Sequence, residues 1–99
     1  MAEKELKILT VCGVGMGSSL VLRMYVEDVL KEMGVKARVE ATEVSMASGA
    51  GADIIMASPT LMDVLRGAAP TVIPIFNFTD KAEIRARLEE YLAGRQPGL

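Results

Sequence analysis

The chain contains no histidine, and this absence excludes more chemistry than any other feature of its composition. Without an imidazole there is no Ser-His-Asp or Cys-His catalysis, no phosphohistidine and none of the usual zinc sites. Tryptophan is also absent, and the net charge of −2 comes without a basic stripe, which argues against nucleic acid as a partner. We therefore expect no metal site and no cofactor, and any reactive group must be activated by the backbone or by a partner.

Long hydrophobic runs and disulfide pairs are missing as well. No apolar run approaches the length of about 20 residues that a bilayer requires. The charged start, Met1–Glu5, lacks the apolar segment of a signal peptide. The single cysteine, Cys12, cannot form an internal disulfide, which is typical of a reducing compartment. The sequence therefore predicts a cytoplasmic protein.

What the 99 residues do contain is an alternation of strand-like and helix-like segments. Short apolar or alternating runs predict strands at 6–11, 35–42, 53–57 and 71–76. An apolar face predicts a long helix over 18–33, with Leu22, Val26, Val29, Leu30 and Met33 buried and Gly34 ending it. Residues 43–51 cross back to the sheet, with room for one helical turn. A short helix is expected from Ser58 to about Arg66. Thr79 or Asp80 can cap a last helix, and Asp80 with Glu83 has the spacing of a capping box.

This alternation predicts an α/β fold with a parallel sheet, as one domain over residues 1–99 with frayed tails at 1–5 and 94–99. The alternation of the second strand leaves one face more polar and places that strand at an edge, and Pro74 indicates an edge or a break in the fourth. Right-handed crossovers then give a four-stranded sheet in the order 2-1-3-4, flanked by helices on both faces. The carboxyl end of the first strand lies at the topological switch point, where open α/β sheets bind ligands.

Cys12 stands at that point, where the first strand ends and a glycine-rich loop begins: Cys12-Gly13-Val14-Gly15-Met16-Gly17-Ser18-Ser19. The glycines allow backbone N–H groups to turn inward around an anion, and the helix start that follows favours negative charge. A thiol in this place is set to become a thiolate. Ser18 and Ser19 add hydroxyls that can cap the helix or reach a phosphoryl oxygen. The pattern predicts a phosphate-handling cysteine whose phosphate is held by residues 13–19.

Other phosphate loops fit this segment less well. Ser18 stands where the dinucleotide fingerprint has its third glycine, and no Gly-Lys-Ser/Thr follows as in a P-loop. Ser18 also replaces the arginine with which a cysteine phosphatase clamps its phosphate. From the residues alone two alternatives stay open. One is a small cysteine phosphatase or arsenate-reductase-like enzyme, and the other is a non-catalytic anion-binding regulatory module.

The segment Cys12–Ser19, opening a helix after a short strand, resembles the IIB component of the bacterial phosphoenolpyruvate-dependent sugar phosphotransferase system. Within that system it is most similar to the ascorbate-type proteins of the ascorbate/galactitol group, and residues 51–58 resemble the third strand and following turn of the same family. The resemblance implies a relay in which a phosphohistidine of the IIA component phosphorylates Cys12. The phosphate then passes to a substrate, L-ascorbate in this type, that is held by the membrane component IIC. Membrane association would be peripheral, through IIC only.

Overall fold

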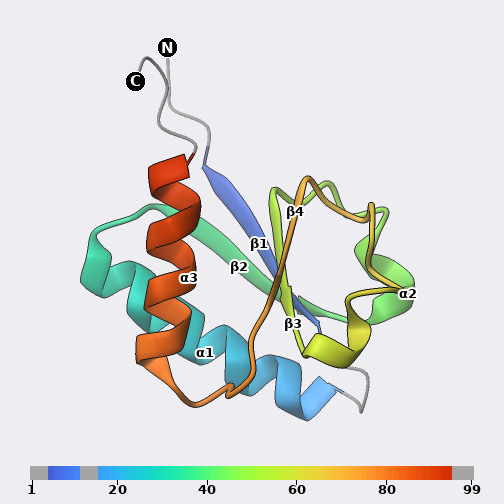
Figure 1. The fold of residues 1–99 in the computed structure, drawn as a ribbon, viewed down its shortest axis with the longest axis horizontal. Coiled ribbons are helices and arrows are strands. Elements are labelled where there is room, and N and C mark those ends of the chain that lie inside the picture. Colours follow the sequence, from blue (N-terminus) through green and yellow to red (C-terminus); the bar gives the residue numbers. More distant parts are fainter. Residues whose placement is uncertain (1–4, 12–15, 95–99) are drawn as a thin grey trace.

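The structure, a computed structural model, describes residues 5–11 and 16–94, apart from the side chains of residues 16, 18 and 94. Within these ranges four strands form one parallel sheet in the order β2-β1-β3-β4 (Figure 1). Their bounds are β1 Leu6–Val11, β2 Ala37–Thr42, β3 Ile54–Ala57 and β4 Thr71–Pro74. The predicted order 2-1-3-4 is confirmed, with β2 and β4 at the two edges.

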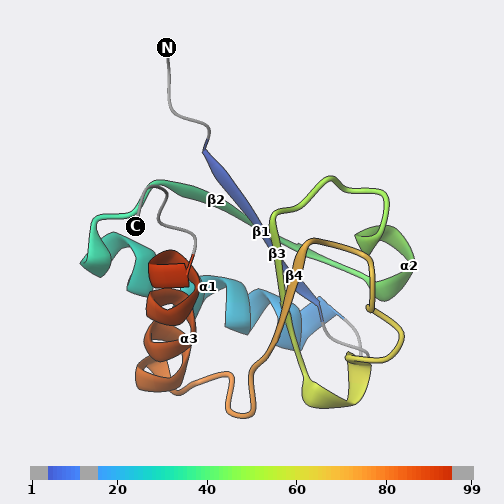
Figure 2. The same ribbon diagram turned by 45° about the horizontal axis from the view of Figure 1, so that its top comes forward.

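Helical segments cover both faces of the sheet, as predicted. The helices α1 (Met16–Met33) and α3 (Lys81–Gly94) pack together on one face, whereas α2 (Val44–Ala47) and the 3-10 helix η1 (Pro59–Leu61) lie on the other (Figures 1 and 2). From β1 the chain first adds β2 on one side of the sheet. It then crosses back past β1 and adds β3 and β4 on the other side. Because parallel crossovers are right-handed, the connections on the two sides of this reversal fall on opposite faces.

Each face of the sheet carries its own apolar cluster, because side chains alternate along β1. Ile8 packs with the buried residues of the two long helices: Leu22, Val26, Val29 and Leu30 of α1, and Ile84 and Leu88 of α3. Leu9 and Val11 belong to the cluster on the opposite face, with Ala47 of α2, Ile55 and Leu65. The apolar face predicted for α1 is therefore the face that the helix buries.

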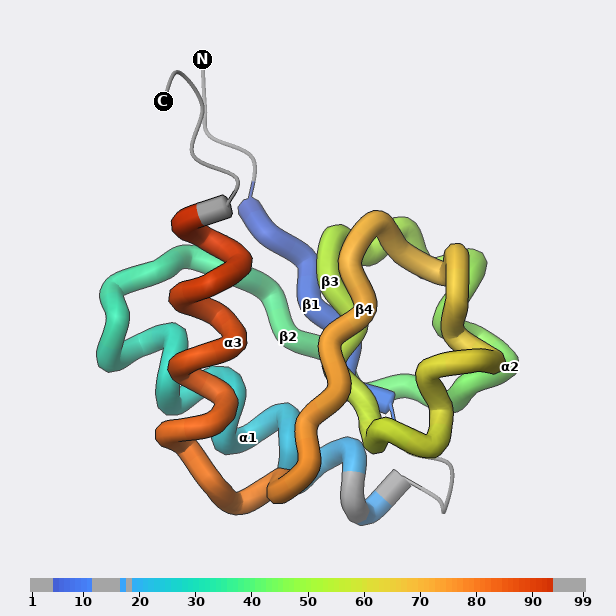
Figure 3. Tube along the Cα trace, in the orientation of Figure 1, coloured from blue at the N-terminus to red at the C-terminus, as the bar shows by residue number. Residues whose placement is uncertain are grey.

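All four strands end at one level of the sheet. Val11, the last residue of β1, pairs with Thr42 of β2 and with Ala57 of β3, and Ala57 pairs in turn with Pro74 of β4. Each of these is the last residue of its strand. Strand β1 therefore ends in the interior of the carboxyl edge, between β2 and β3 (Figure 3).

Helix α1 begins at Met16 rather than at Ser18, and it ends before Gly34 as predicted. Gly34 has a φ of 72°, the left-handed conformation that glycine adopts without steric cost. Its amide donates to the Lys31 carbonyl at 3.2 Å, and the Val35 amide donates to the Leu30 carbonyl at 3.0 Å. These two bonds make a Schellman motif, which satisfies carbonyls that the helix end would leave without a partner.

The helix predicted from Ser58 to about Arg66 is wrong in extent. Ser58 Oγ does accept from the Thr60 amide at 3.4 Å, but only η1 follows, and the chain then continues in turns to Gly67, whose φ is 82°. So short a segment forms few helical bonds for the entropy it loses. Leu65 is its one fully buried residue, so tertiary packing gives little further support to a helix.

Helix α3 begins at the predicted Asp80 cap, but the capping box is incomplete. Asp80 Oδ1 accepts from the amides of Ala82 at 3.0 Å and Glu83 at 3.3 Å. The Asp80 amide, which a capping box would pair with Glu83, donates to the Asn77 carbonyl at 3.0 Å. The Glu83 carboxylate instead accepts from the amides of Phe76 at 2.7 Å and Asn77 at 2.9 Å. Glu83 thus holds the loop after β4 against the first turn of α3.

Candidate functional site

The phosphate site predicted from the sequence falls at the carboxyl end of β1, and the structure describes its two flanks. Outside the described residues lie Cys12, Gly13, Val14 and Gly15, and so do the side chains of Met16 and Ser18. Gly17 is exposed, and Ser19 is fully buried. The structure therefore places the strand–helix junction, by which we mean the end of β1 at Thr10 and Val11 and the first turn of α1 at 16–19.

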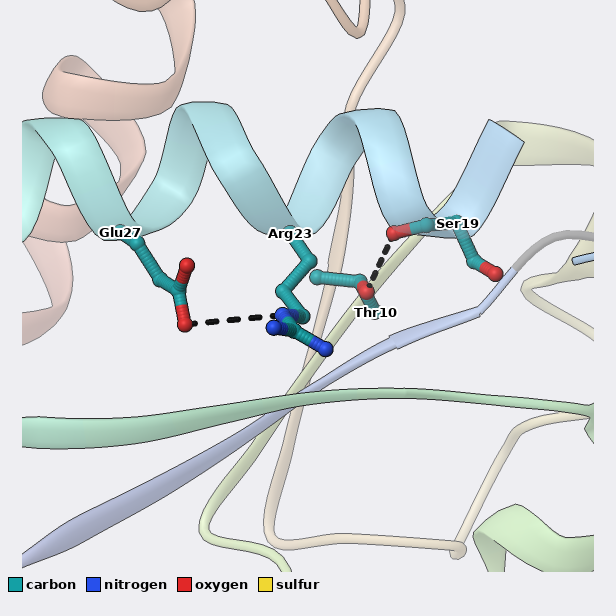
Figure 4. Close-up of polar contacts among 4 residues, drawn as sticks. All are labelled: Thr10, Ser19, Arg23 and Glu27. Carbon is teal, nitrogen blue, oxygen red and sulfur yellow. Dashed lines mark hydrogen bonds and ion pairs between the residues drawn. The ribbon is translucent and has the colours of Figure 1, made fainter. Parts of the chain in front are cut away.

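A buried hydrogen bond joins the two sides of this junction (Figure 4). Thr10 Oγ1 donates to the Ser19 carbonyl oxygen at 2.8 Å. Within the described part of the chain, Thr10 and Ser19 are the two polar residues that the fold buries completely. Sequence reasoning overlooked Thr10, although a hydroxyl on the same strand face as Ile8 was a signal that could have found it.

Arg23 follows Ser19 by one helical turn and lies on the same side of α1, beside Glu27 (Figure 4). Arg23 Nε and Glu27 Oε2 are 3.5 Å apart, and both side chains are partly exposed. An exposed i,i+4 pair of this kind contributes about 0.3–0.5 kcal/mol to stability. The Arg23 guanidinium is thus shared with a carboxylate, as is common on a solvated helix face.

Exposed apolar side chains gather on the first half of α1. Leu20 is 43% exposed, Val21 40% and Met24 58%, and we call these three residues the outer face of α1. They lie opposite the buried face, to which Leu22 and Val26 belong. Single exposed apolar residues are ordinary, but a group within two turns of a helix is suited to contact with another protein.

The loop after β4 adds an exposed aromatic ring at the same edge of the sheet. Phe76 lies just beyond Pro74 and is 74% exposed, although the bond from its amide to Glu83 holds its backbone. On the other side of the edge, the hydroxyls of Ser58 and Thr60 are 2.8 Å apart and form part of the η1 cap. Ser58 Oγ is the group that caps η1, by accepting from the Thr60 amide.

A metal site and a membrane-spanning helix each have requirements that the described residues do not meet. Among them there is no group of three or more acidic, cysteine or histidine side chains that could hold a metal ion. No helix in the described ranges has both the length and the apolar character needed to cross a membrane.

Residues 7–90 match the family model described as the lactose/cellobiose-specific IIB subunit of the PTS system. This chain belongs to the PTS IIB family. Members of the family are phosphotransferases of the phosphoenolpyruvate:carbohydrate phosphotransferase system (PTS), so the predicted sugar phosphotransferase function is confirmed. A IIB component works with a IIA and a IIC component.

Two curated relatives of this PTS IIB chain cover nearly all of it. The ascorbate-specific PTS system EIIB component of Mycoplasma pneumoniae is 35% identical over 95 residues, which are 93% of this chain and 100% of that protein. The protein of the same name from Shigella sonnei is 30% identical over 94 residues, which are 92% of this chain and 93% of that protein.

A solved structure has the same fold. The lactose-specific IIB component domain from Streptococcus pneumoniae superimposes with a TM-score of 0.59 at 19% identity, covering 94% of this chain and 100% of that one. At this identity the likeness concerns the fold alone, and it agrees with the single α/β domain described above.

Proposed function

We propose that this PTS IIB chain is a cytoplasmic phosphocarrier in which Cys12 accepts a phosphoryl group from a phosphohistidine of IIA. The Cys12 thiolate attacks phosphorus, an S–P bond forms and the N–P bond of the donor breaks. In the second step a hydroxyl oxygen of the substrate, bound by the membrane component IIC, attacks the same phosphorus. The S–P bond then breaks, the thiolate returns and the hydroxyl proton is lost.

The observation that carries this proposal is the position of the single cysteine in a PTS IIB fold. Cys12 follows directly on Val11, the last residue of a central strand, and precedes α1. The start of a helix favours an anion and therefore favours both the thiolate and the phosphorylated cysteine. The amides of residues 13–19 are the proposed phosphate ligands: those of Gly13, Val14, Gly15, Met16, Gly17, Ser18 and Ser19.

We propose L-ascorbate as the transported substrate. The support comes from the names of the two relatives from Mycoplasma pneumoniae and Shigella sonnei, both called ascorbate-specific. Their similarity extends over nearly the whole chain, so it reaches the surfaces that a IIA and a IIC component would contact. The phosphatase and the anion-binding module, which the residues alone left open, are not favoured by the family to which the chain belongs.

The partners must approach the carboxyl edge of the sheet, because Cys12 follows β1 there. We propose that the outer face of α1, together with Phe76, receives them. This surface is apolar and exposed, and the backbone of Phe76 is held in place by Glu83. A backbone that is already held loses less conformational entropy on binding, which favours docking.

The decisive experiment records the intact mass of the wild-type chain and of Cys12→Ser after incubation with phosphoenolpyruvate, the general PTS proteins and an ascorbate-type IIA. We expect one added phosphate on the wild type only. A phosphate on Cys12→Ser would contradict the assignment, as would an unmodified wild type beside IIA that is shown to be phosphorylated. Onward transfer to ascorbate, galactitol or lactose in IIC vesicles then tests the substrate.

A further inference from the structure

We propose that Thr10 is a positioning residue for phosphoryl transfer, acting through the hydrogen bond from its hydroxyl to the Ser19 carbonyl. The inference rests on the proposed function of Cys12. Thr10 lies in β1, two residues before Cys12, and Ser19 is the last residue of the segment predicted to bind phosphate. A hydrogen bond of 2.8 Å therefore joins the strand before Cys12 to the end of the predicted phosphate-binding segment (Figure 4).

A hydroxyl is an unexpected choice at position 10. Thr10 lies on the face of β1 that α1 covers, and the apolar residues of that face and helix include Ile8, Leu22 and Val26. Valine has nearly the same shape as threonine and would fill the site without burying a polar group, which costs free energy unless the group is hydrogen-bonded. Packing alone therefore gives no reason for threonine, whereas the bond to α1 does.

The bond supplies a direction that packing lacks. Apolar contacts are non-directional, so they tolerate small shifts and rotations of α1 over the sheet. A hydrogen bond depends on both distance and angle, so it holds the Ser19 carbonyl at one place relative to β1. In a helix the carbonyl oxygen of residue 19 also accepts from the amide of residue 23. A carbonyl oxygen has two lone pairs, so the second is available to accept from the Thr10 hydroxyl. The first turn is thus fixed without loss of a helical bond.

The position of this turn decides how well the helix start stabilises charge on Cys12. The influence of a helix end on an anion falls off within its first turn, so a small displacement changes the acidity of the thiol and the stability of its phosphorylated form. Phosphoryl transfer is sensitive to such shifts, because a misplacement of about 1 Å can cost about a hundredfold in rate. Thr10 acts on this chemistry through α1 and need not touch the phosphate.

The test compares Thr10→Val, which keeps the shape and removes the donor, with Thr10→Ser, which keeps the donor. Ile84→Val is the matched control, because it trims the same cluster far along the chain from the junction. Two assays are run on each variant. The first gives the pH midpoint of alkylation by iodoacetamide, which reports Cys12 alone because the chain has one cysteine. The second gives kcat and KM for transfer from phosphorylated IIA.

We expect Thr10→Val to raise the alkylation midpoint by about half a pH unit. We also expect it to lower kcat about tenfold, with KM for IIA unchanged. Thr10→Ser and Ile84→Val should stay within about twofold of the wild type. The proposal is overturned if Thr10→Val behaves like the wild type in both measurements, if Thr10→Ser falls as far as Thr10→Val, or if the control falls equally. Should Thr10→Val not fold, Thr10→Ala replaces it with the same expectation.

The two proposals fail in different ways. A wild-type chain that accepts no phosphate from phosphorylated IIA refutes the proposed function. The alkylation midpoint still decides about Thr10, because it needs neither IIA nor phosphate. A wild-type chain that is phosphorylated on Cys12, with an alkylation midpoint and a kcat indifferent to Thr10→Val, refutes the positioning role alone.

Discussion

Glu83→Ala removes the acceptor of two backbone hydrogen bonds in the loop after β4. The Glu83 carboxylate receives the amides of Phe76 at 2.7 Å and Asn77 at 2.9 Å, and so ties this loop to α3. We expect the variant to lose stability because both amides lose their partner. A capping-box role, which the spacing from Asp80 favours, would instead confine the damage to the first turn of α3.

The size of the effect follows from these two bonds. Both lie near the surface, where water competes, so each contributes about 1 kcal/mol rather than the larger amount of a buried bond to a charged group. Their joint loss should cost about 2 kcal/mol of unfolding free energy. For a domain of about this size, that corresponds to a Tm lower by about 10 °C.

Urea unfolding measures the loss, and Glu89→Ala provides the control. Glu89 lies on the same helix and pairs with Arg85 at 3.1 Å, but this pair is exposed and should contribute about 0.3–0.5 kcal/mol. Hydrogen exchange then locates the effect, because the amides of Phe76 and Asn77 should exchange faster in Glu83→Ala alone. Equal stability of the two variants, or unchanged exchange at these two amides, would refute the role of Glu83 in holding the loop to α3.

Two further predictions concern the end and the outer face of α1. Gly34→Ala should lower the unfolding free energy, measured in urea, by about 1–2 kcal/mol, because φ is 72° at this position. Gly49→Ala is the control: its new Cβ also has no atom within 4 Å, and it should be neutral or slightly stabilising. Equal effects of the two substitutions would show that the backbone conformation is not the cause. Met24→Glu should raise KM for phosphorylated IIA severalfold without loss of stability, because it charges the proposed docking surface. Ala93→Glu, at the opposite end of the fold, should leave KM unchanged, and a similar rise in both would point to net charge.

The order of the strands could be predicted because a few residues restrict it strongly. Pro74 has no N–H to donate to a neighbouring strand, and the alternation from Val35 to Thr42 exposes one face of that strand to water, so an edge position is favoured for each strand. With both edges assigned, the handedness of the crossovers leaves one arrangement of the central strands. The place of the carboxyl end of β1, in the interior of the sheet's edge, follows from the topology alone.

The partners of individual polar side chains could not be predicted in this way. Glu83 has the spacing of a capping box, yet the fold brings it the amides of Phe76 and Asn77, and no local rule contains that alternative. Thr10 and Ser19 look like a strand residue and a helix cap until the strand and the helix are packed together. Spacing rules describe which groups a side chain can reach within its own element, whereas tertiary structure decides which groups of other elements lie within hydrogen-bond distance.

A last prediction follows from the geometry of phosphoryl transfer at a single sulfur. The attacking and leaving atoms lie roughly in line through phosphorus. In the proposed relay, the Cys12 sulfur attacks and the donor imidazole leaves from the opposite side of the phosphorus. When the phosphocysteine later donates, the substrate hydroxyl must attack opposite the sulfur, in the space that the imidazole has vacated. IIA and the IIC-bound substrate therefore need the same space in turn, and IIA and IIC should compete for this chain.

Competition can be measured with IIC vesicles that lack substrate, so that no onward transfer occurs. We expect increasing amounts of vesicles to raise the KM for phosphorylated IIA while kcat stays constant. Vesicles without IIC serve as the control for non-specific adsorption. A fall in kcat at constant KM would mean that IIA and IIC bind together. The carboxyl edge would then have to admit two partners at separate surfaces, and the shared in-line space would be reached by movement within a ternary complex.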